Sequence, residues 1–543
     1  MIEVPVIIVG GGPVGMMLAL DLDAQGIRSL IVNAEATTRW LPKGSTHNAR
    51  TLEHYRRLGL ARHIRALGLP ADYPTDVGYF TRLAGWELAR IAMPSEAEKQ
   101  RQLLANPTDW PTPEPILRCN QMYAERFLHA RVASSERITL RYGWTCTDWA
   151  ETADGIDATI ERADGAREVW RASYIVGCDG GRSIVRRKLG IHYDGETLDQ
   201  AYLGGPMVNT HVRSSDFYRR TAVRACWQYW AVNAEVRSNL VALDGRGEFI
   251  FTGKLRSPDE QPDEAAIAQR FRATVGADLA VEFLGHSTWI GGQAYVAERF
   301  GSGRALLAGD AVHLFTPTGG FGMNTGVDDV ANLAWKLTAC LKGWGGPRLL
   351  QSYETERRPI AQRNTGASQQ LARNVGAVPV GAAIEEDSAA GAAARAEASA
   401  FLSTFGEEFA SIGVQLGARY EASPLIVPDG SVPPPDDLVR YVPTACPGGR
   451  APHVWMPDGS ALFDHFGRGF TLLCLGGEGD ARPLEAAAAA RHVPLTTLAV
   501  PGAEARDLYR RTYALIRPDQ HVAWRGDRLP DACDALLARV TGW

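Results

Sequence analysis

RALLAGDAVHLFTPTGGFGMNTGVDDVANLAWKL, residues 304–337, joins a buried strand, a sharp turn, a glycine-rich loop and a long helix. Residues 305–308 are a short apolar run, and Gly309-Asp310 predicts a turn that carries a carboxylate. After the loop, apolar residues recur at helical spacing: Val327, Val330, Leu333, Ala334 and Leu337. Backbone amides at a helix N-terminus bind anionic or electron-rich groups, so this stretch predicts a ligand site.

A second signal of the same kind lies at the N-terminus. Residues 6–9 form an apolar strand, GGGPVG at residues 10–15 matches G-x-G-x-x-G, and a helix and another strand are predicted to follow. This is the context of a dinucleotide-binding βαβ unit. The acidic residue expected after the second strand is replaced by Asn33, with Glu35 two residues further on. Asn33 can still hydrogen-bond a ribose hydroxyl.

A third signal is YIVGCDGGRSIVR at residues 174–186. An apolar strand again ends in an acid-glycine turn, and a basic helix start follows. Asp179 comes directly after the buried strand, so its carboxylate needs polar partners. This favours a binding role over core packing.

These three segments, together with HNARTLEHYRRLGL at residues 47–60, resemble the FAD-dependent aromatic hydroxylases. These are single-component flavoprotein monooxygenases of the p-hydroxybenzoate and phenol hydroxylase type. The resemblance covers roughly residues 4–363 and continues more weakly to the C-terminus. It implies an α/β fold: a Rossmann-like FAD-binding domain, an inserted antiparallel-sheet substrate domain and a thioredoxin-like C-terminal domain.

The pattern along the chain suggests where these domains lie. We expect the FAD-binding domain at residues 1–190 and 290–365, the substrate domain at 191–289, a helical linker region at 366–430 and the thioredoxin-like domain at 431–543. Strands are expected at 201–202, 227–232, 239–243 and 248–254. The Pro-rich passage 93–115 is expected to be a mobile surface loop or a lid, and the Ala-rich residues 385–406 are expected to be helical.

The resemblance also implies which residues hold the cofactor. The residues expected to bind FAD or to lie beside it are Gly10, Gly12, Pro13, Gly15, Asn33, Glu35, Lys43, Arg50, Arg118, Gln121, Asp179, Gly309, Asp310, Pro317, Gly320, Gly322, Met323 and Asn324. NADPH or NADH is expected to bind transiently as the reductant, since only one complete dinucleotide fold is present, and O2 is the co-substrate. No metal ligand set is expected.

The implied reaction is hydroxylation of a phenolic aromatic substrate through a flavin hydroperoxide. A phenolate is a better nucleophile than a phenol, so a base or a hydrogen-bond relay would help. His47 is the candidate proton relay, Tyr229 the candidate substrate contact on the predicted sheet, and Pro317 a rigid apolar wall beside the reacting oxygen.

Two other functions stay open. The cofactor motifs do not exclude an epoxidase or a Baeyer–Villiger-type oxygenase that acts on a polycyclic, polyketide-like substrate, because function resides in the cavity and not in the fold. A flavin-binding protein without catalysis is disfavoured, because all three cofactor segments are intact.

Composition sets the remaining limits. The chain has 543 residues, too many for one core, and is 45% hydrophobic and 22% charged. A net charge of −5 without a basic run argues against a nucleic-acid partner. No apolar run is long enough for a membrane span and no signal peptide is evident, so a cytoplasmic protein is expected. The eight cysteines include no C-x-x-C pair, so the C-terminal module is expected to serve packing or homodimer formation.

Overall fold

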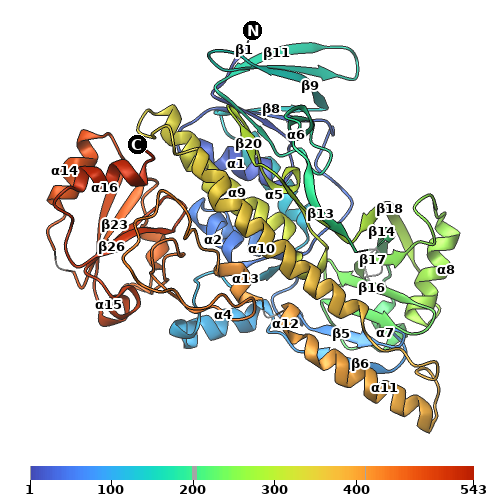
Figure 1. Cartoon of the computed structure of the whole chain (residues 1–543). Helices are drawn as coiled ribbons and strands as arrows, with labels where there is room; N and C mark the ends of the chain where they lie inside the picture. The colour runs from blue at the N-terminus through green and yellow to red at the C-terminus, as the bar shows by residue number, and fades with distance from the viewer. Residues whose placement is uncertain (1, 199–204, 410, 478) are drawn as a thin grey trace.

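The computed structural model describes residues 2–198, 205–409, 411–477 and 479–543 (Figure 1). Its centre is a six-stranded sheet in the order β20-β21-β12-β2-β3-β8. The strands are β2 (Val6–Val9), β3 (Ser29–Asn33), β8 (Ile138–Tyr142), β12 (Tyr174–Gly177), β20 (Gly301–Ser302) and β21 (Ala305–Leu307). Strands β21, β12 and β2, which precede the three motifs, are parallel neighbours. Their carboxyl ends therefore share one edge, as the expected Rossmann-like fold requires.

Helices pack on this sheet and bury their apolar side chains against it. Those that matter for the site are α1 (Pro13–Ala24), α2 (Ala49–Arg57), α5 (Gln121–Ala133), α9 (Gly322–Leu341) and α10 (Gln351–Gly376). Val14 to Leu22 of α1 are buried, and so are residues 324–339 of α9. Figure 1 shows α9 and α10 running side by side through the middle of the molecule. No helix within the described ranges is both long and apolar enough to cross a membrane.

A seven-stranded sheet forms the second domain, in the order β18-β14-β17-β16-β15-β5-β6. Its strands are β5 (Val77–Phe80), β6 (Glu87–Ile91), β14 (Gly205–Arg213), β15 (Gln228–Val232), β16 (Arg237–Ala242), β17 (Glu248–Lys254) and β18 (Glu282–Gly291). It is antiparallel except where β5 runs parallel to β15. Two of its strands thus come from residues 77–91, outside the expected limits 191–289. Residues 201–202, expected to be a strand, lie outside the described residues.

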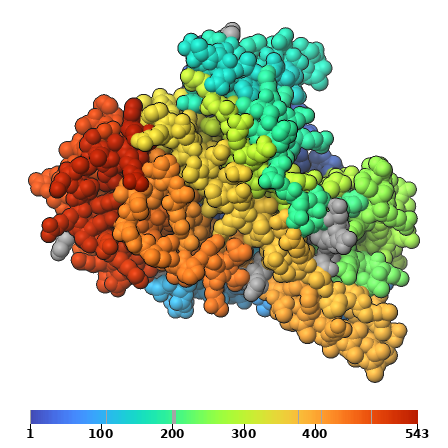
Figure 2. Space-filling view, viewed as in Figure 1, coloured from blue at the N-terminus to red at the C-terminus, as the bar shows by residue number. Residues whose placement is uncertain are grey.

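The Pro-rich passage 93–115 is not a plain loop, contrary to expectation. It contains helix α4 (Glu96–Ala105), which begins with a capping box between Ser95 and Glu98. That S-x-x-E spacing is visible in the sequence and could have predicted the helix. The Ala-rich segment does form a helix, α11 (Ala389–Leu402). In Figure 2 this part of the chain projects at the lower right of the molecule.

The C-terminal domain is a four-stranded sheet in the order β24-β23-β25-β26, flanked by helices. Its elements are β23 (Phe470–Leu475), β24 (Leu495–Val500), β25 (Tyr513–Ile516), β26 (Val522–Gly526), α14 (Arg482–Ala490), α15 (Ala503–Tyr509) and α16 (Cys533–Val540). Its core is continuous with the first domain, because Trp335 of α9 packs edge-on against Phe470, with ring centroids 5.8 Å apart. The domain is therefore packed onto the rest of the chain through apolar surface.

Candidate active site

The three sequence motifs meet at one edge of the central sheet. Gly10 has a φ of +113°, and a Cβ on it would lie 2.2 Å from the carbonyl oxygen of Cys178. Only glycine fits there, so the first motif is pressed against the second. A Cβ on Gly309 would lie 3.1 Å from Val14, which brings the turn of the third motif onto the start of α1. The structure thus assembles the site from segments about 130 to 300 residues apart in sequence.

The first loop has the shape needed for the pyrophosphate of FAD. A Cβ on Gly12 would meet nothing within 4 Å among the described residues, so the backbone there is open to a ligand. Helix α1 starts directly after Gly12 with Pro13 in its first turn, and no described side chain caps it. Its amides are available for an anion. Gly15 faces inward, where a Cβ would lie 2.0 Å from the oxygen of Gly10.

Asn33 and Glu35 divide the role expected of one acidic residue. The amide of Gly11 donates to Oδ1 of Asn33 at 3.0 Å, and Nδ2 of Asn33 donates to the carbonyl of Glu35 at 3.1 Å. The hydroxyl of Tyr142 donates to the carbonyl of Gly11 at 2.7 Å. Asn33 therefore braces the glycine loop. Glu35 is exposed, so its carboxylate is accessible to a ligand.

The two aspartates of the second and third motifs differ in environment. Oδ2 of Asp179 accepts the amide of Ile184 at 2.7 Å, while Oδ1 is buried and has no donor within the described chain. Burial raises the pKa of this carboxyl. A hydroxyl of a bound cofactor would supply the missing donor. Asp310 is exposed, and its backbone oxygen accepts a hydrogen bond from the hydroxyl of Tyr193.

The glycine-rich loop is tied to the segment that precedes α2. Nδ2 of Asn324 donates to the carbonyls of Thr46 at 3.0 Å and Gly320 at 2.6 Å, and its Oδ1 accepts the amide of Asn48 at 2.9 Å. Pro317 is exposed, and Gly322 and Met323 form the first turn of α9. No described side chain caps α9, so its amides can stabilise negative charge, such as that on the pyrimidine edge of a reduced flavin.

Thr46 and His47 are neighbours in the sequence, but their side chains point in opposite directions. Strand β4 (Thr46–His47) pairs with β7 (Leu117–Arg118), and Thr46 lies against Gly320. Nη1 of Arg118 donates to Oγ1 of Thr46 at 2.6 Å, so both side chains are on the side of the glycine loop. His47 projects to the opposite side, fully buried, with Nδ1 3.3 Å from the hydroxyl of Tyr55. Its burial lowers its pKa to about 4.

Two more predicted residues line the start of α5. Nε2 of Gln121 donates to Glu125 at 2.6 Å, and a Cβ on the neighbouring Gly44 would lie 3.8 Å from Oε1 of Gln121. Lys43 is exposed, and its carbonyl accepts Nδ2 of Asn120 at 3.2 Å. The loop that carries Lys43 is therefore anchored by the N-terminal turn of α5.

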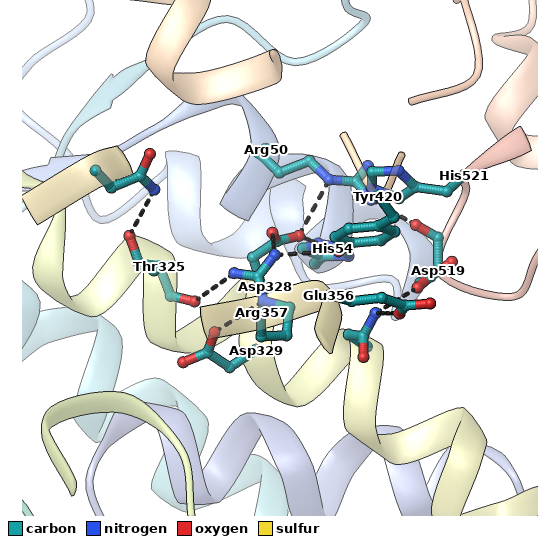
Figure 3. Close-up of polar contacts among 12 residues, drawn as sticks. Arg50, His54, Thr325, Asp328, Asp329, Glu356, Arg357, Tyr420, Asp519 and His521 are labelled. Carbon is teal, nitrogen blue, oxygen red and sulfur yellow. Dashed lines mark hydrogen bonds and ion pairs between the residues drawn. The ribbon is translucent and has the colours of Figure 1, made fainter. Parts of the chain in front are cut away.

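Arg50 lies away from these groups, in a buried polar junction between domains (Figure 3). Its guanidinium donates to Glu53 at 2.9 Å, to Asp328 at 3.3 Å and to Gln520 of the C-terminal domain at 2.7 Å. A further bond reaches the carbonyl of Asp519 at 2.5 Å. The expected cofactor contact is thus occupied by protein partners.

The same junction contains a second arginine with a fully buried side chain. Arg357 donates to Asp329 at 2.9 Å, to the hydroxyl of Tyr420 at 3.1 Å and to the carbonyl of Thr325 at 3.3 Å, and it also pairs with Asp328. Thr325 is in the first turn of α9. The junction therefore fixes the N-terminal end of α9, and only the consecutive acids 328 and 329 hinted at it in the sequence.

The two faces of the seven-stranded sheet have different surroundings. One face is covered by α8 (Glu264–Val275), where the rings of Phe251 and Phe271 lie 5.3 Å apart. Tyr229 belongs to this face: it is fully buried between Phe217 and Phe249, and its hydroxyl accepts the amide of Cys226 at 2.8 Å. The structure places Tyr229 in an aromatic core, with the sheet between it and the dinucleotide domain.

The opposite face, here called the inner face, looks toward the dinucleotide domain. Ile250 packs against Met122 of α5, and Trp40 lies over Gly285. One cross-strand row on this face runs through Tyr79, Trp230, Asn239, Thr252, Asn209 and Ser287. Alternation within β15 distinguishes Trp230 from Tyr229, so the signal was present in the sequence but needed the register to be read.

Comparison with known proteins shows which families, relatives and solved structures this chain resembles. The model of the FAD binding domain matches residues 3–368, and that of the C-terminal domain of aromatic-ring hydroxylases matches residues 444–543. The FAD-dependent monooxygenase apdD of Emericella nidulans is 32% identical over 99% of this chain and 90% of its own. Phenol 2-monooxygenase of Pseudomonas sp. (strain EST1001) is 28% identical over 100% of this chain and 93% of its own. The rebeccamycin biosynthetic enzyme RebC with reduced flavin has a TM-score of 0.88 at 34% identity, covering 100% and 99%.

Proposed function

We propose a reaction from one premise: the chain belongs to the FAD-dependent aromatic-ring hydroxylases and is a flavin monooxygenase. The reaction is hydroxylation of a phenolic ring at the expense of NADPH or NADH. One oxygen atom of O2 enters the ring in place of hydrogen. The other leaves as water, with the reduced nicotinamide supplying two electrons in the form of one hydride and the solvent supplying a proton.

FAD, when bound, supplies electron transfer from the nicotinamide and activation of O2. The residues that would hold it are those of the three motifs. The open loop at Gly12 and the uncapped start of α1 suit the pyrophosphate, and the buried oxygen of Asp179 suits a hydroxyl. Asn324 fixes the loop at Gly320, and the uncapped start of α9 places amides beside it. These groups are preorganised to stabilise negative charge.

The inner face of the seven-stranded sheet is the observation that carries the substrate proposal. Its central row combines aromatic side chains with amide and hydroxyl groups, as a site for a ring bearing polar substituents requires. Arg118 lies beside the start of β15, since its guanidinium is 3.7 Å from the ring centroid of Trp227. A cation there favours a phenolate over a phenol. His47, on the core side of β4, could act only through Tyr55 or the backbone of β4.

The name of the Pseudomonas relative supports a phenolic substrate. The similarity to the biosynthetic enzyme RebC is compatible with a substrate that has a larger ring system. It therefore keeps the second candidate open, an epoxidase or Baeyer–Villiger-type oxygenase that acts on a polycyclic substrate. A homodimer, expected from the C-terminal module, and a cytoplasmic location, expected from the composition, are further parts of the proposal.

Anaerobic reduction of the flavin tests the proposal. The purified holoenzyme is mixed with NADPH or NADH, with and without a panel of phenols, naphthols and cyclic ketones, and the loss of yellow absorbance is followed. Acceleration by a phenol or naphthol, with a product heavier by one oxygen after aeration, is the expected result. Acceleration by ketones alone, with ring-expanded products, would favour the second candidate. A folded protein that never binds FAD would overturn both.

A further inference from the structure

Asn209 and Thr252 form a preset hydrogen-bond donor on the inner face. They are directly opposite each other on β14 and β17, and Oγ1 of Thr252 donates to Oδ1 of Asn209 at 2.9 Å. That bond occupies the acceptor oxygen of the amide and so fixes which way the amide group points. Nδ2 of Asn209, with its two N–H groups, is left without an acceptor among the described residues.

The burial of the two residues fits a polar group held ready for a ligand. Thr252 is 7% exposed, whereas Asn209 is half-buried and remains accessible. Asn239, next to Thr252 in the same row, has a buried Oδ1 that lacks a partner in the described ranges. Buried polar atoms are normally satisfied, so the unpaired Oδ1 of Asn239 indicates a missing hydrogen-bond partner beside the accessible amide of Asn209.

The N–H groups of Asn209 limit which ligand groups can bind to this residue. A neutral N–H group binds an oxygen acceptor, and the carbonyl oxygen of an aryl ketone or quinone is a better acceptor than the oxygen of a phenol or an aryl ether. We infer that Asn209, positioned by Thr252, binds a carbonyl oxygen attached to the aromatic ring, so that the substrate class is a hydroxylated aryl ketone or quinone. This assignment rests on the proposed function.

Two naphthols of equal size test it: 6-acetyl-2-naphthol, which has the carbonyl, and 6-ethyl-2-naphthol, which lacks it. Their dissociation constants are measured by calorimetry on the oxidised holoenzyme. The wild type is expected to prefer the acetyl compound by about tenfold, the worth of one such hydrogen bond. Because the preference is a ratio for one protein, a general loss of stability does not change it.

Substitutions then locate the preference. Asn209→Asp, which lacks the N–H donors, and Thr252→Val are expected to abolish it, and Thr252→Ser is expected to retain it. Thr210→Val is the matched control: Thr210 follows Asn209 on β14, and its side chain points to the opposite face beside Phe251. It should keep the wild-type ratio.

A wild type that binds both naphthols equally, or an Asn209→Asp variant that keeps the tenfold ratio, would overturn the inference. Binding of neither naphthol would also overturn the assigned substrate class. The proposed function is judged separately, by whether any phenol or naphthol accelerates reduction of the flavin.

Discussion

Asp179 shows how a single buried residue can cost stability at a place where a cofactor is proposed to bind. Burial raises the pKa of its carboxyl, and one oxygen has no donor in the described chain. Because the pKa is raised, the residue's stabilising contribution is present only at low pH and is lost as the pH rises through the folded value. At neutral pH the ionised form is therefore a burden on the apoprotein.

Asp179→Asn should consequently stabilise the apoprotein at pH 7 and weaken the binding of FAD. An asparagine oxygen can still accept the amide of Ile184. We expect a higher melting temperature without FAD and a dissociation constant for FAD raised about tenfold, the worth of one hydrogen bond to a charged group. Asp154→Asn on an exposed turn is the control and should change neither quantity. Tighter FAD binding by Asp179→Asn would contradict the role assigned to the carboxylate.

Buried histidines predict how stability depends on pH. Burial lowers the pKa of His54 and His521 to about 4 and that of His453 to about 3. An unfolded histidine binds its proton near pH 6.5, so the stabilising contribution is complete above that value and is lost as the pH falls toward 4. Glu53, whose pKa is lowered to about 2 by Arg450, acts in the same direction only below about pH 4.5.

We therefore expect the free energy of unfolding to fall between pH 6.5 and 4.5, before carboxylates with a lowered pKa, such as Glu53, begin to titrate. Urea denaturation at several pH values measures it. A His453→Gln variant should show a shallower decline, whereas His286→Gln, on the exposed side of β18, should follow the wild type. A flat profile across this interval would show that these histidines are protonated in the folded protein.

At the scale of elements, the loop between β3 and β4 bridges two domains. Trp40 in this loop is 54% exposed, and its ring occupies the space where a side chain on Gly285 would be, 2.1 Å from the Cβ position. Gly285→Ala should displace the ring and separate the loop from β18. The expected result is faster cleavage by trypsin after Arg39 or Lys43 and a lower melting temperature. Gly165→Ala, where a Cβ would meet no described atom within 4 Å, is a control for introducing alanine at a positive φ.

The elements also show what sequence could and could not predict. Glycine motifs can be recognised in the sequence because the local backbone geometry requires glycine. The structure places Gly10 against Cys178 and Gly309 against Val14, at one edge of the central sheet. Tyr229 illustrates the limit: its strand was foreseen, but which face it occupies depends on register and on α8. The partners of Arg50 could not be predicted from the sequence. Gln520, for example, is 470 residues away, and only tertiary packing brings the two side chains into contact. Charged residues in a sequence do not identify their partners.

At the scale of the whole molecule, the C-terminal domain is an integral part of the enzyme. Its loop at residues 517–520 enters the buried junction, where Arg517 donates two bonds of 2.7 Å to Glu356 of α10. Lys336 of α9 donates to the same carboxylate at 2.6 Å, and all three side chains are fully buried. Glu356 therefore binds Lys336 of the dinucleotide domain and Arg517 of the C-terminal domain, and these two positive charges lower the pKa of its carboxyl.

Glu356→Gln should destabilise the whole chain and not one domain. Removing one member of a buried ionic group leaves the others uncompensated, at a cost of about 3–5 kcal/mol. Because Trp335 and Phe470 also share one apolar core, we expect a single calorimetric transition in both proteins, shifted to lower temperature in the variant. Glu196→Gln breaks an ion pair of the same length with Arg373, but both side chains are 53% exposed, so the loss should be about 0–1 kcal/mol. Two separate transitions in the wild type would show that the domains unfold independently and that the junction couples them only weakly.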